Sequence, residues 1–221
     1  VIGDGAATVP LFINQANQTG TVSLLGVNTF GGDITINGGV LSINSDAALG
    51  LISNNGNYGD GYHNSYSATN QTINLNGGIL EAASSFTLSS NRNISLGLSG
   101  GGLAAQLGTK LVYDGVIADG ALSANLTINN AGQGGNVYLS GANTYSGDTI
   151  VNGGILTVAS GGTLGNNSSV LSIADAIVDL QTNLIIRALQ MSGNASITNS
   201  SGPSSLRVNG SSQLAGVVIT S

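Results

Sequence analysis

Apolar and polar residues alternate along most of this 221-residue chain, in short runs of three to five residues. Ile34 and Ile36, for example, flank Thr35. The same alternation recurs at Val22/Leu24, Leu41/Ile43, Ile73/Leu75, Phe86/Leu88, Ile94/Leu96/Leu98, Leu126/Ile128, Val137/Leu139, Leu156/Val158, Leu171/Ile173, Val178/Leu180, Leu184/Ile186, Leu189/Met191 and Leu206/Val208. A period of two predicts short β-strands with one buried face. Only residues 183–191 are ambiguous between strand and helix, so we expect an all-β protein.

Glycine-rich and asparagine-rich turns separate these runs, and a sandwich or an antiparallel barrel also uses such turns. Three features favour a β-solenoid: the strands are very short, the turns are dense, and an Asn-Gly-Gly element recurs at 37–39, 76–78 and 152–154. Its spacings of 39 and 76 residues are near multiples of about 19, a plausible length for one coil. We therefore expect residues 1–221 to form a single right-handed parallel β-helix of about 9–11 coils.

A long internal repeat supports this architecture. Residues 22–50 and 137–165 align without gaps and are identical at about half of their positions, and a partial copy of the centre occupies 73–82. The shared positions include both glycines and alternating apolar residues. In the first copy they are Val22, Leu24, Gly26, Asn28, Thr29, Gly32, Asp33, Asn37, Gly38, Gly39, Leu41, Ser45, Leu49 and Gly50. Stacking such units places aliphatic residues over one another, and each buried one contributes roughly 1.5–3 kcal/mol.

The polar repeat positions are predicted to shape the bends. We expect Asn28, Asn143, Asn37 and Asn152 to adopt the left-handed conformation there and to cap backbone groups. Asp33 and Asp148 occupy equivalent positions, which indicates a turn-capping role for both.

The repeat resembles the passenger-associated repeat of autotransporters, the type V secretion systems. In the second copy the resemblance lies in Leu139, Gly141, Asn143, Thr144, Tyr145, Gly147, Asp148, Gly154, Leu156, Val158, Leu164 and Gly165; in the first it lies in Gly26, Asn28, Thr29, Phe30, Gly32, Asp33, Gly39 and Leu41. The resemblance implies a right-handed parallel β-helix outside the cell, often in adhesins. A signal peptide and a membrane barrel, which the family possesses, are not found in this sequence.

The charge content limits the partners of the chain. Only 6% of the residues are charged, with a net charge of −6, and the four cations (Arg92, Lys110, Arg187 and Arg207) are scattered. They form no basic stripe, so we expect no nucleic-acid binding. No apolar run is long enough for a membrane-spanning helix, and we expect no insertion of this segment into a membrane.

Residues 51–70 break the alternation and predict a loop that leaves the stack. They hold Tyr58, Tyr62 and Tyr66 and the sole histidine, His63. Tyrosine and asparagine side chains make adaptable contacts, so these four residues form a predicted binding loop, with an inert loop as the alternative. One histidine, with Asp60 three residues before it, makes a poor metal site. The segment 56–64 has only a faint likeness to a calcium-binding repeat, and we expect no cofactor or metal.

The carboxylates bear on whether the chain is an enzyme, because many parallel β-helices cleave polysaccharides. Asp175 and Asp179 lie four residues apart, but Asp175 precedes a strand, while Asp179 and Glu81 each alternate outward between inward-facing residues. This pattern predicts surface and turn roles, and we expect no enzyme activity.

The leading hypothesis is a structural and adhesive segment of a bacterial surface or secreted protein, with glycans, other surface proteins or copies of itself as partners. A subunit of an extracellular filament or surface layer is the alternative from another class, because uncapped solenoid ends stack. A polysaccharide-cleaving β-helix is the third.

Overall fold

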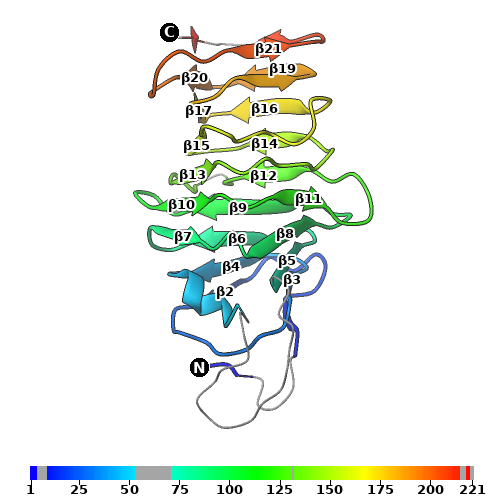
Figure 1. Ribbon diagram of the computed structural model, residues 1–221, viewed down its shortest axis with the longest axis vertical. Coiled ribbons are helices and arrows are strands. Elements are labelled where there is room, and N and C mark those ends of the chain that lie inside the picture. The colour runs from blue at the N-terminus through cyan, green and yellow to red at the C-terminus, as the bar shows by residue number, and fades with distance from the viewer. Residues whose placement is uncertain (4–8, 53–70, 131, 215–217, 220–221) are drawn as a thin grey trace.

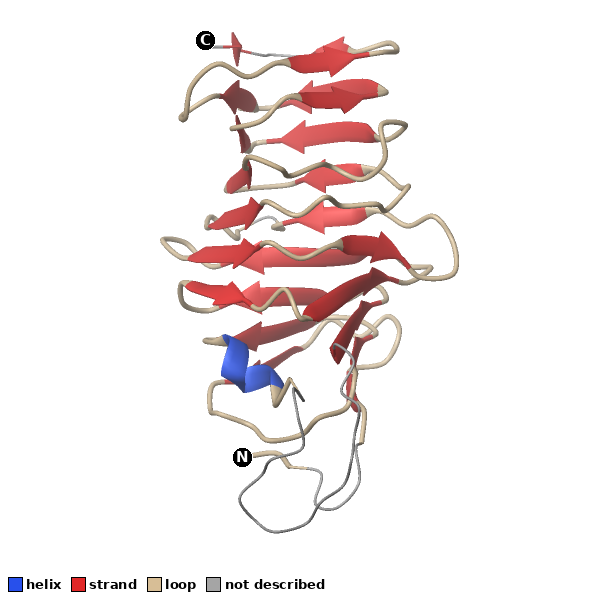
Figure 2. Ribbon diagram, viewed as in Figure 1, coloured by secondary structure: helices blue, strands red, loops and turns tan. Residues whose placement is uncertain are grey.

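The computed structural model describes residues 1–3, 9–52, 71–130, 132–214 and 218–219, and within them the chain forms a tall stack of short strands (Figure 1). The described residues contain 23 strands and one short 3₁₀ helix, η1 (Asp46–Leu49). Figure 2 shows the strands lying across the long axis, with the helix near the N-terminal end. Every paired strand runs parallel to its neighbour. The prediction of an all-β parallel solenoid is confirmed.

The strands form four parallel sheets along the stack. Sheet A contains β1 (Leu11–Ile13), β3 (Ile34–Ile36), β5 (Gln71–Leu75), β8 (Arg92–Leu96) and β11 (Ile117–Asp119). Sheet B contains β2 (Thr21–Leu24), β4 (Val40–Ile43), β6 (Ile79–Ala82), β9 (Gly101–Ala105), β12 (Leu126–Ile128), β14 (Thr149–Val151), β16 (Val170–Ala174), β19 (Ala188–Ser192) and β22 (Gln213–Leu214). Sheet C contains β7 (Phe86–Leu88), β10 (Lys110–Tyr113), β13 (Asn136–Leu139), β15 (Ile155–Val158), β17 (Ile177–Leu180), β20 (Ser196–Thr198) and β23 (Val218–Ile219). Sheet D contains β18 (Leu184–Ile186) and β21 (Leu206–Val208), and it takes the place of sheet A in the last turns of the chain order.

The length of a turn varies along the chain and differs from the predicted value. The pair Ile173 and Met191 encloses a short turn, and the pair Leu111 and Val137 encloses a longer one. Ser42 pairs directly with Glu81, which lies 39 positions further on, so that spacing is a single turn with an insertion. The prediction of two turns there is wrong. The solenoid accordingly has about eight turns, fewer than the 9–11 expected from a shorter coil.

Inward-facing aliphatic side chains stack from turn to turn and form the core. On sheet B one such column follows the strand register through seven turns: Leu41, Leu80, Leu103, Ile128, Val151, Ile173 and Met191. None of these side chains is more than 3% exposed. Burial of about 1.5–3 kcal/mol per aliphatic side chain, repeated at every level, offsets the ordering of many short strands.

The two repeat copies build the same two-turn unit on different sides of the solenoid. In the first copy the strands β2, β3 and β4 lie in sheets B, A and B; in the second, β13, β14 and β15 lie in sheets C, B and C. The second unit is therefore rotated about the long axis relative to the first, so that each of its strands lies in the neighbouring sheet. Each copy has one side without a strand, and there the chain at Phe30 or Tyr145 turns a fully buried aromatic ring inward.

Candidate functional site

The predicted binding loop lies largely outside the described residues. Tyr58, Tyr62, His63 and Tyr66, with Asp60, all fall in the range 53–70, and their role as a binding site stays a prediction. The structure does describe the two ends of this segment, Leu51 and Gln71, and the residues that hold them.

Two repeat asparagines connect three successive turns. The Asn143 side chain is 4% exposed; its Oδ1 accepts from Ile117 N at 2.9 Å in the turn before, and its Nδ2 donates to Thr163 O at 2.8 Å in the turn after. Asn28 makes the same pair of bonds, from Ile2 N at 2.7 Å and to Ala48 O at 2.8 Å. The capping role predicted for Asn28 and Asn143 is confirmed. It is wrong for Asn37 and Asn152, which cap no backbone group among the described residues; the Asn37 Oδ1 accepts from Asn76 Nδ2 instead. The predicted left-handed backbone is wrong, because none of Asn28, Asn37, Asn143 and Asn152 has a positive φ.

Among the described residues, the asparagines with a left-handed backbone are Asn14, Asn17 and Asn129. Asn14 and Asn129 are equivalent positions upstream of the predicted repeat, and the sequence pattern did not predict their role. Asn14 (φ 56°) donates from Nδ2 to Gly20 O and Gly38 O, and Asn129 (φ 51°) donates to Gly135 O and Gly153 O. The two positions are related by the same offset as the repeat. The signal was present in the sequence, where LFINQANQTG at 11–20 aligns with LTINNAGQGG at 126–135. The structural unit therefore begins at 11 and 126.

The aromatic position of the repeat is a plug for the side that has no strand. Phe30 is 1% exposed and Tyr145 is completely buried. The Tyr145 hydroxyl shares a 2.5 Å hydrogen bond with Thr149 Oγ1, and burial raises the pKa of Tyr145 well above its usual value. In the first copy Ile34 takes the place of Thr149, so an apolar pair replaces the hydroxyl pair.

The glycines of the repeat permit close approach of the backbone. A Cβ on Gly32 would lie 2.1 Å from Val9 O, and one on Gly147 would lie 2.2 Å from Ala124 O. Gly39 and Gly154 also have positive φ (63° and 56°) and sit against the Asn14 and Asn129 side chains. A larger residue at these positions would push two turns apart.

Within the described part of the chain, six aspartates accept hydrogen bonds from backbone amides of the following turn. Asp33 accepts from Thr72 N and Asp148 from Val170 N, both at 2.8 Å, which confirms the predicted capping role of this repeat position. The other pairs are Asp46 with Ser89 N, Asp119 with Ser146 N, Asp175 with Asn194 N and Asp179 with Ser200 N. The same residue type therefore closes the turns along the solenoid.

Asp179 and Glu81 face outward as predicted, but the surface role predicted for them is wrong, because neither side chain is exposed to solvent. Asp179 is 8% exposed and also accepts from Ser200 Oγ and Gln181 Nε2. Glu81 is 7% exposed and accepts from Ser42 Oγ, Gln106 Nε2 and Gln133 Nε2, which come from three other turns. Both lie on the outer face of a sheet, but polar side chains of neighbouring turns cover them. Asp175 lies in a turn with φ 49°, as its position before a strand predicts.

The least expected residue is Arg92, which points into the solenoid and is 1% exposed. Its Nε donates to Asp46 Oδ1 at 2.8 Å, an ion pair in which the aspartate side chain is 29% exposed. The guanidinium also donates to the carbonyl oxygens of Leu49 and Gly50 and to Gln71 Oε1. The sequence alone does not predict that this cation is buried. Arg92 shares the inward face of β8 with Ile94 and Leu96, but this is evident only once the structure shows that the strand begins at Arg92.

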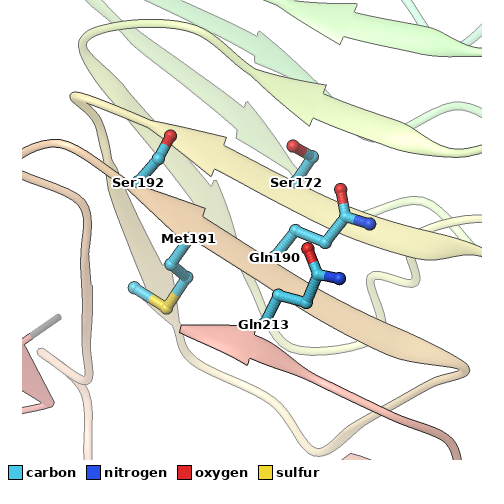
Figure 3. A pocket seen from close by; sticks show the side chains of 5 residues that line it. All are labelled: Ser172, Gln190, Met191, Ser192 and Gln213. Carbon is cyan, nitrogen blue, oxygen red and sulfur yellow. The ribbon is translucent and has the colours of Figure 1, made fainter. Parts of the chain in front are cut away.

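One shallow surface cavity of about 240 Å³ lies on the last turns (Figure 3). Ser172, Gln190 and Gln213 follow one another in the register of β16, β19 and β22, and Ser192 and Met191 complete the lining. Figure 3 shows the two glutamine side chains side by side on one face and Met191 on the other face of its strand. None of the five lining side chains is ionisable. The cavity therefore offers neutral serine and glutamine groups for hydrogen bonding, together with the apolar Met191.

Among the described residues, no three His, Cys, Asp or Glu side chains come together as a metal site. Likewise, the described part of the chain has no helix with the length and apolar character needed to cross a membrane.

Comparison with known proteins agrees with the repeat geometry. A family profile, the passenger-associated-transport-repeat, matches residues 17–43 and 133–158. The chain is also 30% identical, over 194 aligned residues, to the adhesin BmaC autotransporter of Brucella suis biovar 1 (strain 1330). The repeat profile and this relative support an autotransporter passenger domain. The chain is covered to 70% by the alignment and spans 6% of the length of the relative. No solved structure matches it significantly.

Both matched ranges lie within the two-turn units of the chain. The first begins just after Asn14, and the second begins at Gln133 and ends with β15. The bridging asparagines Asn28 and Asn143 and both aromatic plugs fall inside the matches. The family pattern therefore corresponds to the residues that join successive turns.

Proposed function

We propose that this chain is a non-catalytic, adhesive part of a bacterial cell-surface or secreted protein. The solenoid serves as a rigid scaffold, and residues 51–70 supply the contact residues Tyr58, Tyr62, His63 and Tyr66. Glycans or other surface proteins are the partners that such tyrosine-rich and asparagine-rich contacts suit.

One observation carries the non-catalytic part of the proposal. Asp33, Asp46, Asp119, Asp148, Asp175 and Asp179 each accept a backbone N–H of the following turn. A glycan-cleaving site needs carboxyl groups that face the scissile bond and exchange protons with it. Carboxylates that close turns of the scaffold are poorly placed for that work. The similarity to an adhesin supports the adhesive part.

Binding of the purified chain to a glycan array and to epithelial cells tests the adhesive function. A variant with alanine at Tyr58, Tyr62 and Tyr66 is expected to lose at least tenfold in apparent affinity, about 1.4 kcal/mol. The matched control is Tyr138→Ala, which removes a tyrosine from sheet C, where Lys110 Nζ lies 3.9 Å from the ring centroid. Equal binding by the triple variant and the parent chain would refute the assigned residues, and absence of binding by the parent would refute the adhesive function.

Release of reducing sugar from a panel of polysaccharides tests the non-catalytic part. No release is expected. Release that is abolished by Asp175→Asn or Asp179→Asn would instead establish a β-helix enzyme.

A further inference from the structure

The first repeat copy makes the same hydrogen bonds from its backbone N–H groups as the second copy, both before and after residues 52–70. Before that segment, Leu51 N donates to Phe30 O at 2.8 Å, as Asn166 N donates to Tyr145 O at 2.9 Å in the second copy. After it, Thr72 N donates to Asp33 Oδ1 as Val170 N donates to Asp148 Oδ1. Leu51 thus corresponds to Asn166, and Thr72 corresponds to Val170.

The corresponding connections differ greatly in length. Residues 52–71 join the two equivalent points in the first copy, and residues 167–169 join them in the second. Asp33 and Thr72 are 39 positions apart in the sequence, whereas their counterparts Asp148 and Val170 are 22 apart. The first copy therefore carries 17 additional residues, the difference between 39 and 22, in an otherwise ordinary turn.

Each copy closes this corner with different side chains. In the second copy Ser169 Oγ donates to Leu164 O and Asn166 O, both at 3.0 Å, so the short connection satisfies its own carbonyl groups. In the first copy Gln71 Nε2 donates to Leu49 O at 3.1 Å and Arg92 Nη2 donates to Gly50 O at 2.8 Å. Arg92 also bonds to Gln71 and forms an ion pair with Asp46, so one side chain contacts the chain on both sides of the additional residues.

The equivalent cation of the second copy has no such role. Arg187 lies one turn beyond Ser169, as Arg92 lies one turn beyond Gln71. It is exposed, and its Nε donates to Ser168 O at 2.9 Å. Gly161 stands where the first copy has Asp46, so no carboxylate is available to draw the guanidinium inward.

We propose that this corner of the repeat is an insertion site, and that the buried Arg92 with Asp46 and Gln71 makes the coil stack independent of the residues inserted there. The inference depends on the proposed function solely for what the inserted residues do; the independence of the stack concerns folding. Such a socket lets one scaffold carry segments of different sequence at the same corner.

The experiment replaces residues 52–70 by Asn-Ser, the two residues that precede Ser169 in the second copy. The shortened chain is expected to keep the far-ultraviolet circular dichroism of the parent and a thermal midpoint within about 3 °C of it. Loss of cooperative unfolding in the shortened chain would overturn the proposal. Because the readout is folding, this result is separate from any change in adhesion.

The second arm tests Arg92 in the full-length chain. Arg92→Met removes the ion pair with Asp46 and the side-chain donor to Gly50 O, and the thermal midpoint is expected to fall by about 10 °C. Arg187→Met is the matched control and is expected to change the midpoint by less than about 2 °C. Equal effects of the two substitutions would show that Arg92 does not hold the corner.

Discussion

A buried asparagine side chain can link two successive turns of this solenoid, because its amide carries both an acceptor oxygen and an NH₂ donor. A buried Asn143 faces an N–H on one turn and a C=O on the next, and both are satisfied by a single amide. Aspartate lacks the donor, and serine is too short to reach both turns with fixed geometry. Asparagine is therefore a joint between turns, whereas leucine and isoleucine fill the space between them.

Asn143→Ala should lower the free energy of unfolding by about 2–4 kcal/mol, because Ile117 N and Thr163 O are left without partners in a dry site. Urea titration followed by circular dichroism measures the loss. Thr144→Ala provides the control, since the Thr144 side chain is exposed and a change within about 0.5 kcal/mol is expected. A loss of the same size in both variants would contradict the bridging role.

Two equivalent glycines give a sharper test of close backbone approach. A Cβ on Gly141 would lie 1.8 Å from Gly115 O, whereas a Cβ on Gly26 meets nothing within 4 Å. Gly141→Ala should destabilise the chain by about 2–3 kcal/mol through steric displacement, while Gly26→Ala should change stability by less than about 0.5 kcal/mol. Thermal unfolding of the two variants side by side decides this, and equal effects would mean that the glycines serve the turn conformation alone.

The elements show how much of the fold the sequence pattern contains. Alternation located most strands, as at Ile34–Ile36 and Leu171–Ile173, because each needs an inward row for the core. It failed at Leu98, which continues the alternation of Ile94 and Leu96 but lies in a turn and is 69% exposed. Pairing between turns, not local pattern, ends the strand at Leu96.

The sequence pattern does not predict which sheet of the solenoid a given strand joins. Local residues form the two-turn unit equally well in sheets A and B or in sheets B and C, so the choice depends on the number of residues between the copies. The lengths of the turns could not be predicted from the local pattern either. The spacing of 39 positions between Ser42 and Glu81 is long enough for two short turns, and only the pairing of these two residues shows that it forms one turn. Burial of Arg92 depends on contacts with Asp46 and Gln71 that are distant in sequence.

The aromatic plug and its partner four residues later act as a pair within the unit. Tyr145→Phe leaves the completely buried Thr149 hydroxyl without a partner and should cost about 1–3 kcal/mol. Tyr145→Phe with Thr149→Ile recreates the Phe30 and Ile34 pair of the first copy and should regain most of that loss. A double-mutant cycle in urea measures the coupling, and strictly additive effects would show that the two residues are independent.

At the scale of the whole molecule, each turn of the solenoid contacts only the turns before and after it. Stability in such a stack is close to a sum of terms for each turn and for each interface between turns. Central turns have an interface on both sides. In the 221-residue segment taken by itself, the turns with β1 and β2 and those with β21 and β22 have an interface on one side, and Leu206 and Val208 in β21 are only partly buried.

Amide hydrogen exchange should therefore be graded along the axis. We expect the slowest exchange in β9, β12 and β14, where sheet B has paired strands on both sides and the inward residues are buried, and the fastest in β21 and β22. Mass spectrometry of peptides after timed exchange measures this gradient, and Arg92→Met should extend the fast-exchanging region into β5 and β8 while β14 and β16 remain protected. Uniform exchange across all turns would mean that the solenoid opens as one cooperative body, and nearest-neighbour stacking would then be the wrong description of its energetics.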